Sequence, residues 1–143
     1  MHPALKRDVR NNILLAGQHI QAVFPRVGGT GDTFFYTIGN AERGLPELLL
    51  IGGFRPEIAM HMLNEIAQYM RERGKAPEEG FLDIGWTLPF KVRKAGGNVR
   101  TEYTAQAGEY LGHERYEVIQ VMICDGEGRY PGDDGCQFEV PRP

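Results

Sequence analysis

Helical and extended hydrophobic patterns alternate along the chain. Residues Pro3 to about Ala16 place apolar side chains on one helical face and are followed by Gly17, which predicts an N-terminal helix over residues 1–17. Pro56 to Arg73 gives the clearest helical pattern, with proline in the first turn and Gly74 directly after it. A shorter helix is predicted within Thr101–Leu111.

Extended segments separate these helices. They are His19–Phe24, Thr33–Gly39, Glu47–Gly53, Trp86–Lys94 and Tyr116–Cys124. The segment from Glu47 is apolar on both faces, which predicts a central strand. Pro89 cannot donate a ladder hydrogen bond, so Trp86–Lys94 is predicted at a sheet edge. The sum is an α+β fold: one domain, residues 1–143, with a mostly antiparallel sheet, two or three helices packed on it, and a mobile tail over residues 137–143.

Composition narrows the function classes. The chain has 143 residues, a formal net charge of −3 and a pI near 5.8, and no basic stripe, which disfavours nucleic-acid binding. The N-terminus has no signal-peptide pattern and the apolar runs are too short for a bilayer, so we expect a cytoplasmic protein without membrane contact. In that compartment Cys124 and Cys136 are expected to be free thiols.

Familiar catalytic and metal motifs do not occur. Glu57, His61 and Glu65 share a helix face, but that face continues with polar residues, as a solvated face does. We therefore expect no metal and no cofactor. The chain contains no serine, which excludes a serine-based triad.

The stretch Ile123–Cys136 concentrates acids, glycines and one arginine after an apolar strand. Arg129 occupies a position where a calcium loop needs an oxygen ligand, and the lysine and hydroxyl of a phosphate loop are missing. Two interpretations remain. Asp125 and Arg129 either fix a long loop by pairing, or they border a functional site at the strand end.

Two polar residues interrupt apolar strands. Glu47 opens its strand after Pro46, and Gln120 lies in the middle of another. Each is either a hydrogen-bond clip between strands or part of a polar pocket at the end of the sheet. The candidate pocket residues are Tyr36, Thr37, Glu47, Gln120, Asp125 and Arg129.

Several motifs occur together in a fixed order. The chain reads F-F-Y-T-I-G, then G-L-P-E-L, then a helix with L-N, then a strand with Gln120 and finally D-G-E-G-R-Y-P. In this pattern, from about His19 to Cys136, the chain resembles a bacterial family described as a domain of unknown function, DUF4262. The resemblance implies one domain and the pocket residues named above, and it implies no reaction.

The chain departs from that family pattern in two places. The usual ending reads P-W-D-P-G, whereas this chain has Pro131-Gly132-Asp133-Asp134-Gly135 and therefore lacks a large apolar anchor. Asn40 stands where a leucine usually follows T-I-G.

Two functions remain open from the sequence. The first is a non-catalytic accessory protein, including the immunity type, that binds a protein partner or a small anionic ligand. The second is a small hydrolase-like enzyme in which Glu47 or Asp125 is the general base and Arg129 holds an anionic substrate. The absence of serine, of metal-ligand spacing and of a phosphate loop favours the first. Trp86 and Phe90 on the predicted edge strand are compatible with a homodimer.

Overall fold

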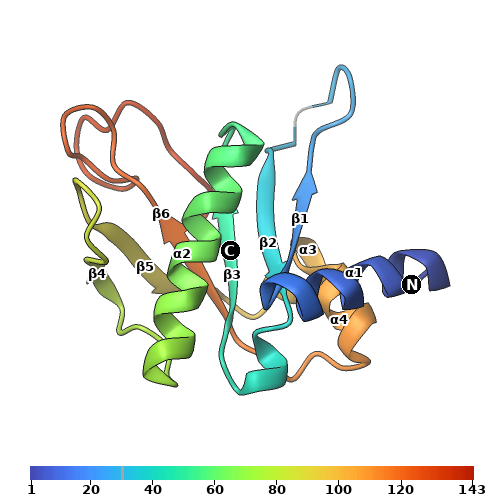
Figure 1. Cartoon of the computed structure of the whole chain (residues 1–143). Coiled ribbons are helices and arrows are strands. Elements are labelled where there is room, and N and C mark those ends of the chain that lie inside the picture. The colour runs from blue at the N-terminus through green and yellow to red at the C-terminus, as the bar shows by residue number, and fades with distance from the viewer. Residues whose placement is uncertain (30) are drawn as a thin grey trace.

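The computed structural model describes residues 1–29 and 31–143, and these form a six-stranded sheet with the order β1-β2-β3-β6-β5-β4 (Figure 1). The strands are β1 (His19–Val23), β2 (Phe34–Ile38), β3 (Glu47–Ile51), β4 (Gly80–Leu82), β5 (Phe90–Lys94) and β6 (Val118–Met122). β3 and β6 pair in parallel at the centre, and the other neighbouring strands pair antiparallel. The predicted α+β class with a mostly antiparallel sheet is confirmed.

Helices surround the sheet. They are α1 (Pro3–Ala16), the 3₁₀ helix η1 (Ala41–Arg43), α2 (Pro56–Arg73), α3 (Val99–Glu102) and α4 (Ala105–Leu111). The ends of α1 and α2 agree with the prediction, because local signals determine both. Each begins with proline, and each is capped by a left-handed glycine, Gly17 or Gly74. Among the described residues, no helix has the length and apolar character required to cross a membrane.

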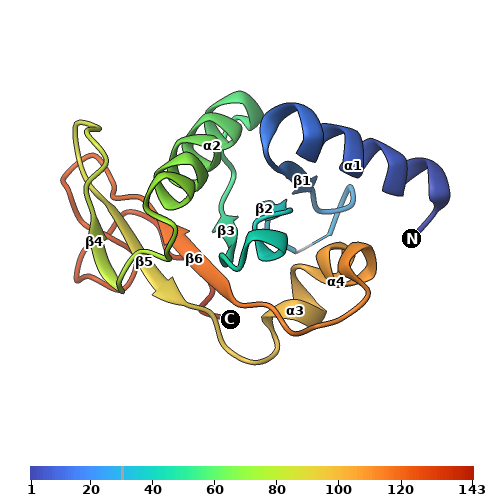
Figure 2. The same cartoon turned by 60° about the horizontal axis from the view of Figure 1, so that its bottom comes forward.

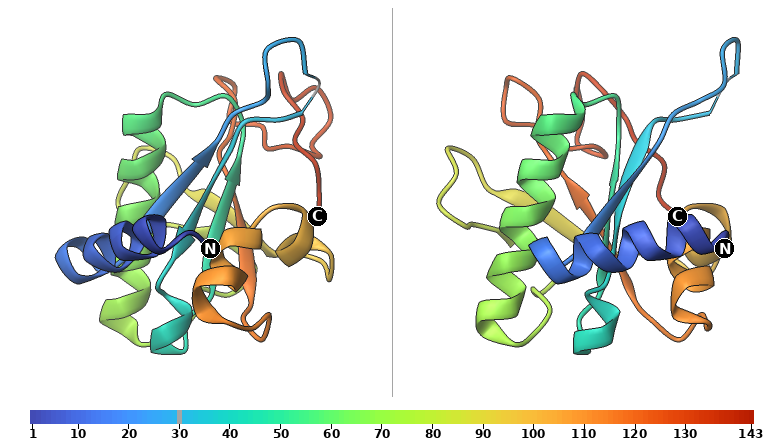
Figure 3. Two further views of the ribbon diagram at one scale, coloured as in Figure 1. Left: turned by 90° about the vertical axis from the view of Figure 1, so that its right-hand side faces the viewer. Right: turned by 45° about the vertical axis from the view of Figure 1, so that its right-hand side comes forward.

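The sheet separates two apolar clusters. On one face, Leu48 and Leu50 pack against Leu63 and Ile66 of α2. On the other face, the cluster around Leu49 includes residues of α3 and α4, while α1 lies beside β1 and adds buried side chains to the same cluster. Figure 2 shows α2 on one side of the strands and α3 and α4 on the other, and the left view of Figure 3 shows the same layers from the side.

The position of β5 differs from the prediction. β5 starts at Phe90, directly after Pro89, and lies between β6 and β4, so it is an internal strand. The edge is formed by β4, whose three residues pair with β5. The prediction was wrong because Pro89 precedes the strand, so its missing N–H removes no hydrogen bond from the sheet.

The helix predicted within Thr101–Leu111 is divided into α3 and α4. Thr104 stands between them, and its hydroxyl is within hydrogen-bonding distance of the buried hydroxyl of Tyr116, at 2.8 Å. The Tyr116 hydroxyl also donates to the Thr104 carbonyl. A long-range contact therefore fixes the break, and helical periodicity gives no signal for it.

The C-terminal segment, residues 137–143, follows a defined path along the sheet. The carbonyl of Pro141 accepts a hydrogen bond from Gln120, and the carbonyl of Pro143 accepts one from the Gly96 amide. Val140 packs against the apolar cluster that contains Leu49. The sequence predicts that this segment is mobile, and a truncation can test whether these contacts hold it in place.

Candidate functional site

The first residue of β3, Glu47, carries a carboxylate that is fully removed from solvent, with 0% relative exposure. Oε1 accepts hydrogen bonds from the Thr37 hydroxyl at 2.8 Å and the Asn40 amide at 3.2 Å. Oε2 accepts from the amides of Gly39 and Ala41, each at 3.0 Å. We call this carboxylate and its four donors the Glu47 site.

The turn between β2 and β3 directs these donors inward. Gly39 has φ of +125°, and a Cβ there would lie 3.0 Å from Cγ1 of Ile13, so a side chain at this position would strain the backbone and would require Ile13 to shift. The amides of Asn40 and Ala41 lie at the start of η1, where amides have no acceptor within the helix. The Glu47 carboxylate therefore satisfies backbone donors that would otherwise be buried without partners.

The protonation of Glu47 follows from two opposing effects. Burial raises the pKa of Glu47, and the hydrogen bonds from Ala41, Thr37, Gly39 and Asn40 offset part of that rise. Each oxygen already accepts two hydrogen bonds, so the geometry is that of an ionised carboxylate. This carboxylate holds the turn between β2 and β3 in place.

A buried polar network extends from the Glu47 site to α2. The Asn40 side-chain amide donates to Thr37 Oγ1 at 3.2 Å and to Gln18 Oε1 at 2.8 Å. Gln18 in turn donates to Asn64 Oδ1 at 2.9 Å. The Thr37 hydroxyl also accepts from the Leu48 amide at 2.8 Å. Sequence reasoning missed Gln18, and the only signal for Asn40 was its departure from the family leucine.

Asp125 has a comparable role in the long loop after β6, which we call the Asp125 loop (residues 124–137). Oδ1 accepts from the amides of Glu127 and Arg129, both at 2.9 Å. Oδ2 accepts from the Gln137 amide at 2.9 Å and from Arg129 Nε at 3.3 Å. Burial alone raises the pKa of Asp125, but these hydrogen bonds outweigh it and lower that pKa to about 2.

Arg129 is held within the same loop. Besides its contact with Asp125, its guanidinium lies so near Gly135 that a Cβ there would be 2.9 Å from Nη1. The Arg129 carbonyl accepts from the Asp125 amide at 2.7 Å. Of the two interpretations left by the sequence, these contacts agree with the one in which the pair fixes a long loop.

The remaining pocket candidates lie on the opposite face from Thr37. The Tyr36 side chain is buried in the cluster that contains Leu49, and its burial raises the pKa of its hydroxyl. Gln120 is also buried, and it accepts from Arg93 Nε at 2.7 Å while donating to the Pro141 carbonyl at 2.9 Å. Both polar ends of Gln120 are therefore used between β5, β6 and the C-terminal segment.

The candidates lie at two ends of the sheet. Because β3 and β6 are parallel, with Glu47 opposite Val118, Glu47 lies at the start of both strands. Asp125 and Arg129 follow the end of β6, and Figure 1 shows this loop at the opposite end of the sheet from η1. The structure brings Thr37 and Glu47 together, but it does not form the single pocket in which both would join Gln120 and Arg129.

The other candidates for chemistry are a histidine and a carboxylate on α2 and the two cysteines. His61 and Glu65 form an exposed contact of 3.7 Å on α2, and His61 packs beside Trp86, which is partly buried. No group of three potential metal ligands occurs among the described residues. Cys124 and Cys136 are both unpaired.

An open cleft of about 520 Å³ lies next to the Glu47 site. We call it the η1 cleft. It is lined by Ala41, Gly44, Leu45, Pro46, Ala76, Arg100, Glu114, Arg115, Tyr116 and Glu117. The Arg100 guanidinium donates to the Tyr116 carbonyl at 3.0 Å and is thereby fixed at the cleft. These residues come from four segments that lie far apart in the chain, so no local sequence pattern predicts the grouping.

Comparison with known families supports the resemblance seen in the motifs. The model of a family described as "Domain of unknown function (DUF4262)" matches residues 12–137, which is most of the chain. The chain belongs to the DUF4262 family. No curated protein and no solved structure matches it.

The matched region of this DUF4262 protein contains both polar sites. The segment Thr37-Ile38-Gly39 supplies two donors of the Glu47 site, and the segment Pro46-Glu47-Leu48 supplies the acceptor. Asp125 and Arg129 lie near the end of the same region. In this member, the motif residues therefore form two separate polar centres that hold turns, one at each end of the central strands.

Proposed function

We propose that this DUF4262 protein is a non-catalytic binding domain and that its ligand occupies the η1 cleft. One observation carries the proposal: the two acids that could act as a general base, Glu47 and Asp125, each accept four hydrogen bonds from the chain segments around them. A general base must offer an oxygen to the proton that it removes. The enzyme alternative therefore has the weaker support.

The η1 cleft has the properties expected of a small binding site. Its volume of about 520 Å³ falls within the range of ligand sites, roughly 300–1,000 Å³. Leu45 and Pro46 provide an apolar floor, and both are largely buried. Arg100 and Arg115 provide guanidinium donors for an anionic group, and Glu114 and Glu117 line the same cleft. A small ligand that joins an apolar body to a carboxylate or phosphate matches this combination.

The test is a binding screen by thermal shift, followed by calorimetry, with small carboxylates, phosphate esters and short acidic peptides. A ligand at about one hundred times its dissociation constant adds about 2.7 kcal/mol to the free energy of unfolding, which raises Tm by several degrees. We expect a saturable hit that is lost in Arg115→Glu, because this change reverses an exposed charge at the cleft.

The matched control is Arg26→Glu, an equal change at an exposed arginine that does not line the cleft. Binding that is equally weakened by both variants reflects net charge and contradicts a site in the cleft. Turnover of any screened ester or phosphate that disappears in Asp125→Asn contradicts the non-catalytic assignment.

A further inference from the structure

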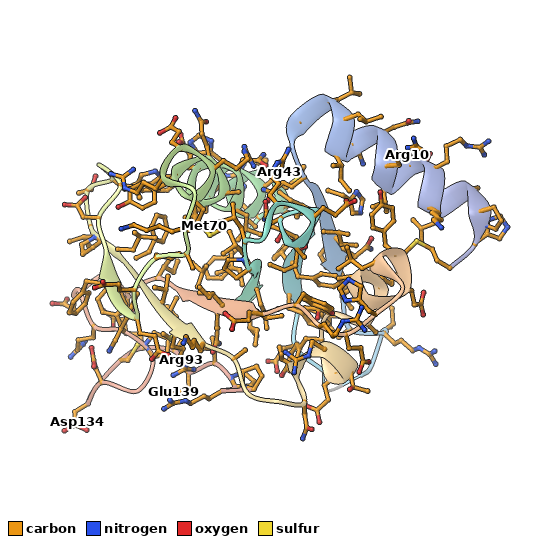
Figure 4. All side chains as sticks on the ribbon, turned by 90° about the horizontal axis from the view of Figure 1, so that it is seen from below. Arg10, Arg43, Met70, Arg93, Asp134 and Glu139 are labelled. Carbon is orange, nitrogen blue, oxygen red and sulfur yellow. The ribbon has the colours of Figure 1, made fainter. Side chains whose placement is uncertain are left out.

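Two arginines from different elements meet at the C-terminal end of α1. Gly17 caps α1, Arg43 ends η1, and Arg71 lies in the last turn of α2. Arg43 donates from Nη1 to the Gly17 carbonyl. The Arg71 guanidinium lies so near that a Cβ at residue 17 would be 3.1 Å from its Cζ. Figure 4 shows Arg43 where α2 approaches the end of α1. We call Arg43 and Arg71 the arginine pair.

The positive charge of the arginine pair is only partly balanced. Neither residue forms an ion pair with an acid among the described residues. Burial lowers the pKa of Arg71, the neighbouring charge of Arg43 lowers it further, and Glu72 offsets part of the effect. Glu72 itself accepts a hydrogen bond from Gln68. Because guanidinium groups remain protonated in proteins, two like charges are held close together.

Arg71 also has an unused donor. Its Nη1 is buried and has no hydrogen-bond partner within the described part of the chain. Two other partly buried arginines differ: Arg93 donates to Gln120, and Arg129 donates to Asp125. Buried N–H groups normally have an acceptor, so the charge of Arg71 is not fully compensated by its own surroundings.

The surroundings of the arginine pair are fixed. Gln18, next to Gly17, donates to the Leu63 carbonyl and to Asn64 of α2, and accepts from Asn40 at the start of η1. The three elements that carry the arginine pair and its glycine are thus tied together by buried hydrogen bonds. A ligand bound there would not have to order them, which favours affinity.

We propose that Arg43 and Arg71 form a binding site for a compact oxyanion, a phosphate or carboxylate group, beside Gly17. Guanidinium groups offer several N–H donors in a planar fork that matches both anions. The Gly17 carbonyl accepts one donor of Arg43, and an oxyanion would accept from other N–H groups of the arginine pair, since Arg71 Nη1 itself has no surface open to a ligand. The site is separate from the η1 cleft, because neither arginine lines that cleft.

The experiment compares Tm in sodium phosphate and in sodium chloride at equal ionic strength, with sodium acetate as a third arm. The unchanged chain should show a saturable rise of a few degrees with phosphate or acetate, beyond any effect of chloride. A response to phosphate alone identifies a phosphate site, and a response to acetate alone identifies a carboxylate site. Either response supports the proposal if it depends on the arginine pair.

Three variants establish that dependence. Arg71→Met and Arg43→Met should each abolish most of the anion-dependent rise, and Arg43 is exposed, so its variant is expected to fold even if Arg71→Met does not. Arg73→Met is the matched control in the same turn of α2, where the guanidinium packs on the Tyr69 ring, and it should keep the rise.

The outcomes that overturn the proposal are equally definite. It fails if neither anion raises Tm beyond chloride, or if Arg43→Met responds like the unchanged chain. A rise that is lost in Arg115→Glu but kept in Arg43→Met assigns the anion to the η1 cleft instead. The proposed function and this second site can therefore fail independently.

Discussion

At the residue scale, an ionised carboxylate without solvent costs several kcal/mol unless its lone pairs are used. Glu47 meets this requirement with one hydroxyl and three backbone amides. Its donors also need the carboxylate, since Gly39 and Asn40 are buried and Ala41 is partly buried. The acid and the turn therefore stabilise each other, and a change that preserves shape but removes an acceptor should be costly.

Glu47→Gln makes that change. The NH₂ group of glutamine would replace one carboxylate oxygen and would face two hydrogen-bond donors that then lack an acceptor. We therefore expect the free energy of unfolding to fall by about 2–4 kcal/mol. Urea denaturation measures this. Glu57→Gln, at an exposed residue of α2, is the control and should change stability by no more than about 0.5 kcal/mol. Equal, small effects in both variants would show that the Glu47 site contributes little to folding.

Asp125 leads to a prediction about pH. Its pKa is about 2 in the folded state against an ordinary 3.8, so the folded state favours the ionised form. This contribution is complete above about pH 4 and is lost as the pH falls towards 2. Asp125→Asn should therefore be less stable than the unchanged chain at pH 7, and the difference between the two should shrink from pH 4 to pH 2.

The measurement is Tm against pH for both chains, and the difference between the curves removes the contributions of other acids. Asp134→Asn serves as the control, because Asp134 is exposed in the same loop and points away from it (Figure 4). A difference between Asp125→Asn and the unchanged chain that stays constant from pH 7 to pH 2 would contradict the folded-state pKa of Asp125.

At the element scale, the sequence predicted elements well where local signals define them. α2 begins at Pro56 and ends before Gly74 because the proline and the left-handed glycine act on their own turns. β4 was missed because its three residues, Gly80–Leu82, are too few to show a period, and only pairing with β5 defines them. Together with the position of Pro89 before β5, that omission accounts for the error about the edge strand.

The same reasoning explains which parts of the candidate site were predictable. Thr37 and Glu47 lie on antiparallel neighbours joined by a short turn, so their proximity follows from the sequence order. Arg129 was grouped with them because it also follows a strand end, but the parallel pairing of β3 and β6 places it at the far end of the sheet. The η1 cleft and the arginine pair depend on how distant segments pack, and a single sequence carries no pattern for that.

At the scale of the whole molecule, the C-terminal segment contacts the Asp125 loop, the centre of the sheet and the loop before α3. The Gln137 amide donates to Asp125, Pro141 accepts from Gln120 in the centre of the sheet, and Pro143 accepts from Gly96 before α3. These contacts use backbone groups of residues 137–143, so they do not depend on side-chain chemistry in this segment. Val140 adds apolar contact with the cluster around Leu49.

Deleting residues 140–143 tests whether this segment is part of the fold or the mobile tail that the sequence predicts. The deletion removes two hydrogen bonds and the packing of Val140, so we expect the free energy of unfolding to fall by about 2–3 kcal/mol. Arg142→Ala is the control, since it retains both backbone carbonyls, and it should have little effect. If urea denaturation finds the deletion as stable as the control, the segment does not hold the sheet. A large loss confined to the deletion would instead explain why Gln120, a polar residue in the middle of an apolar strand, is compatible with a stable core: its amide is a docking point for the end of the chain.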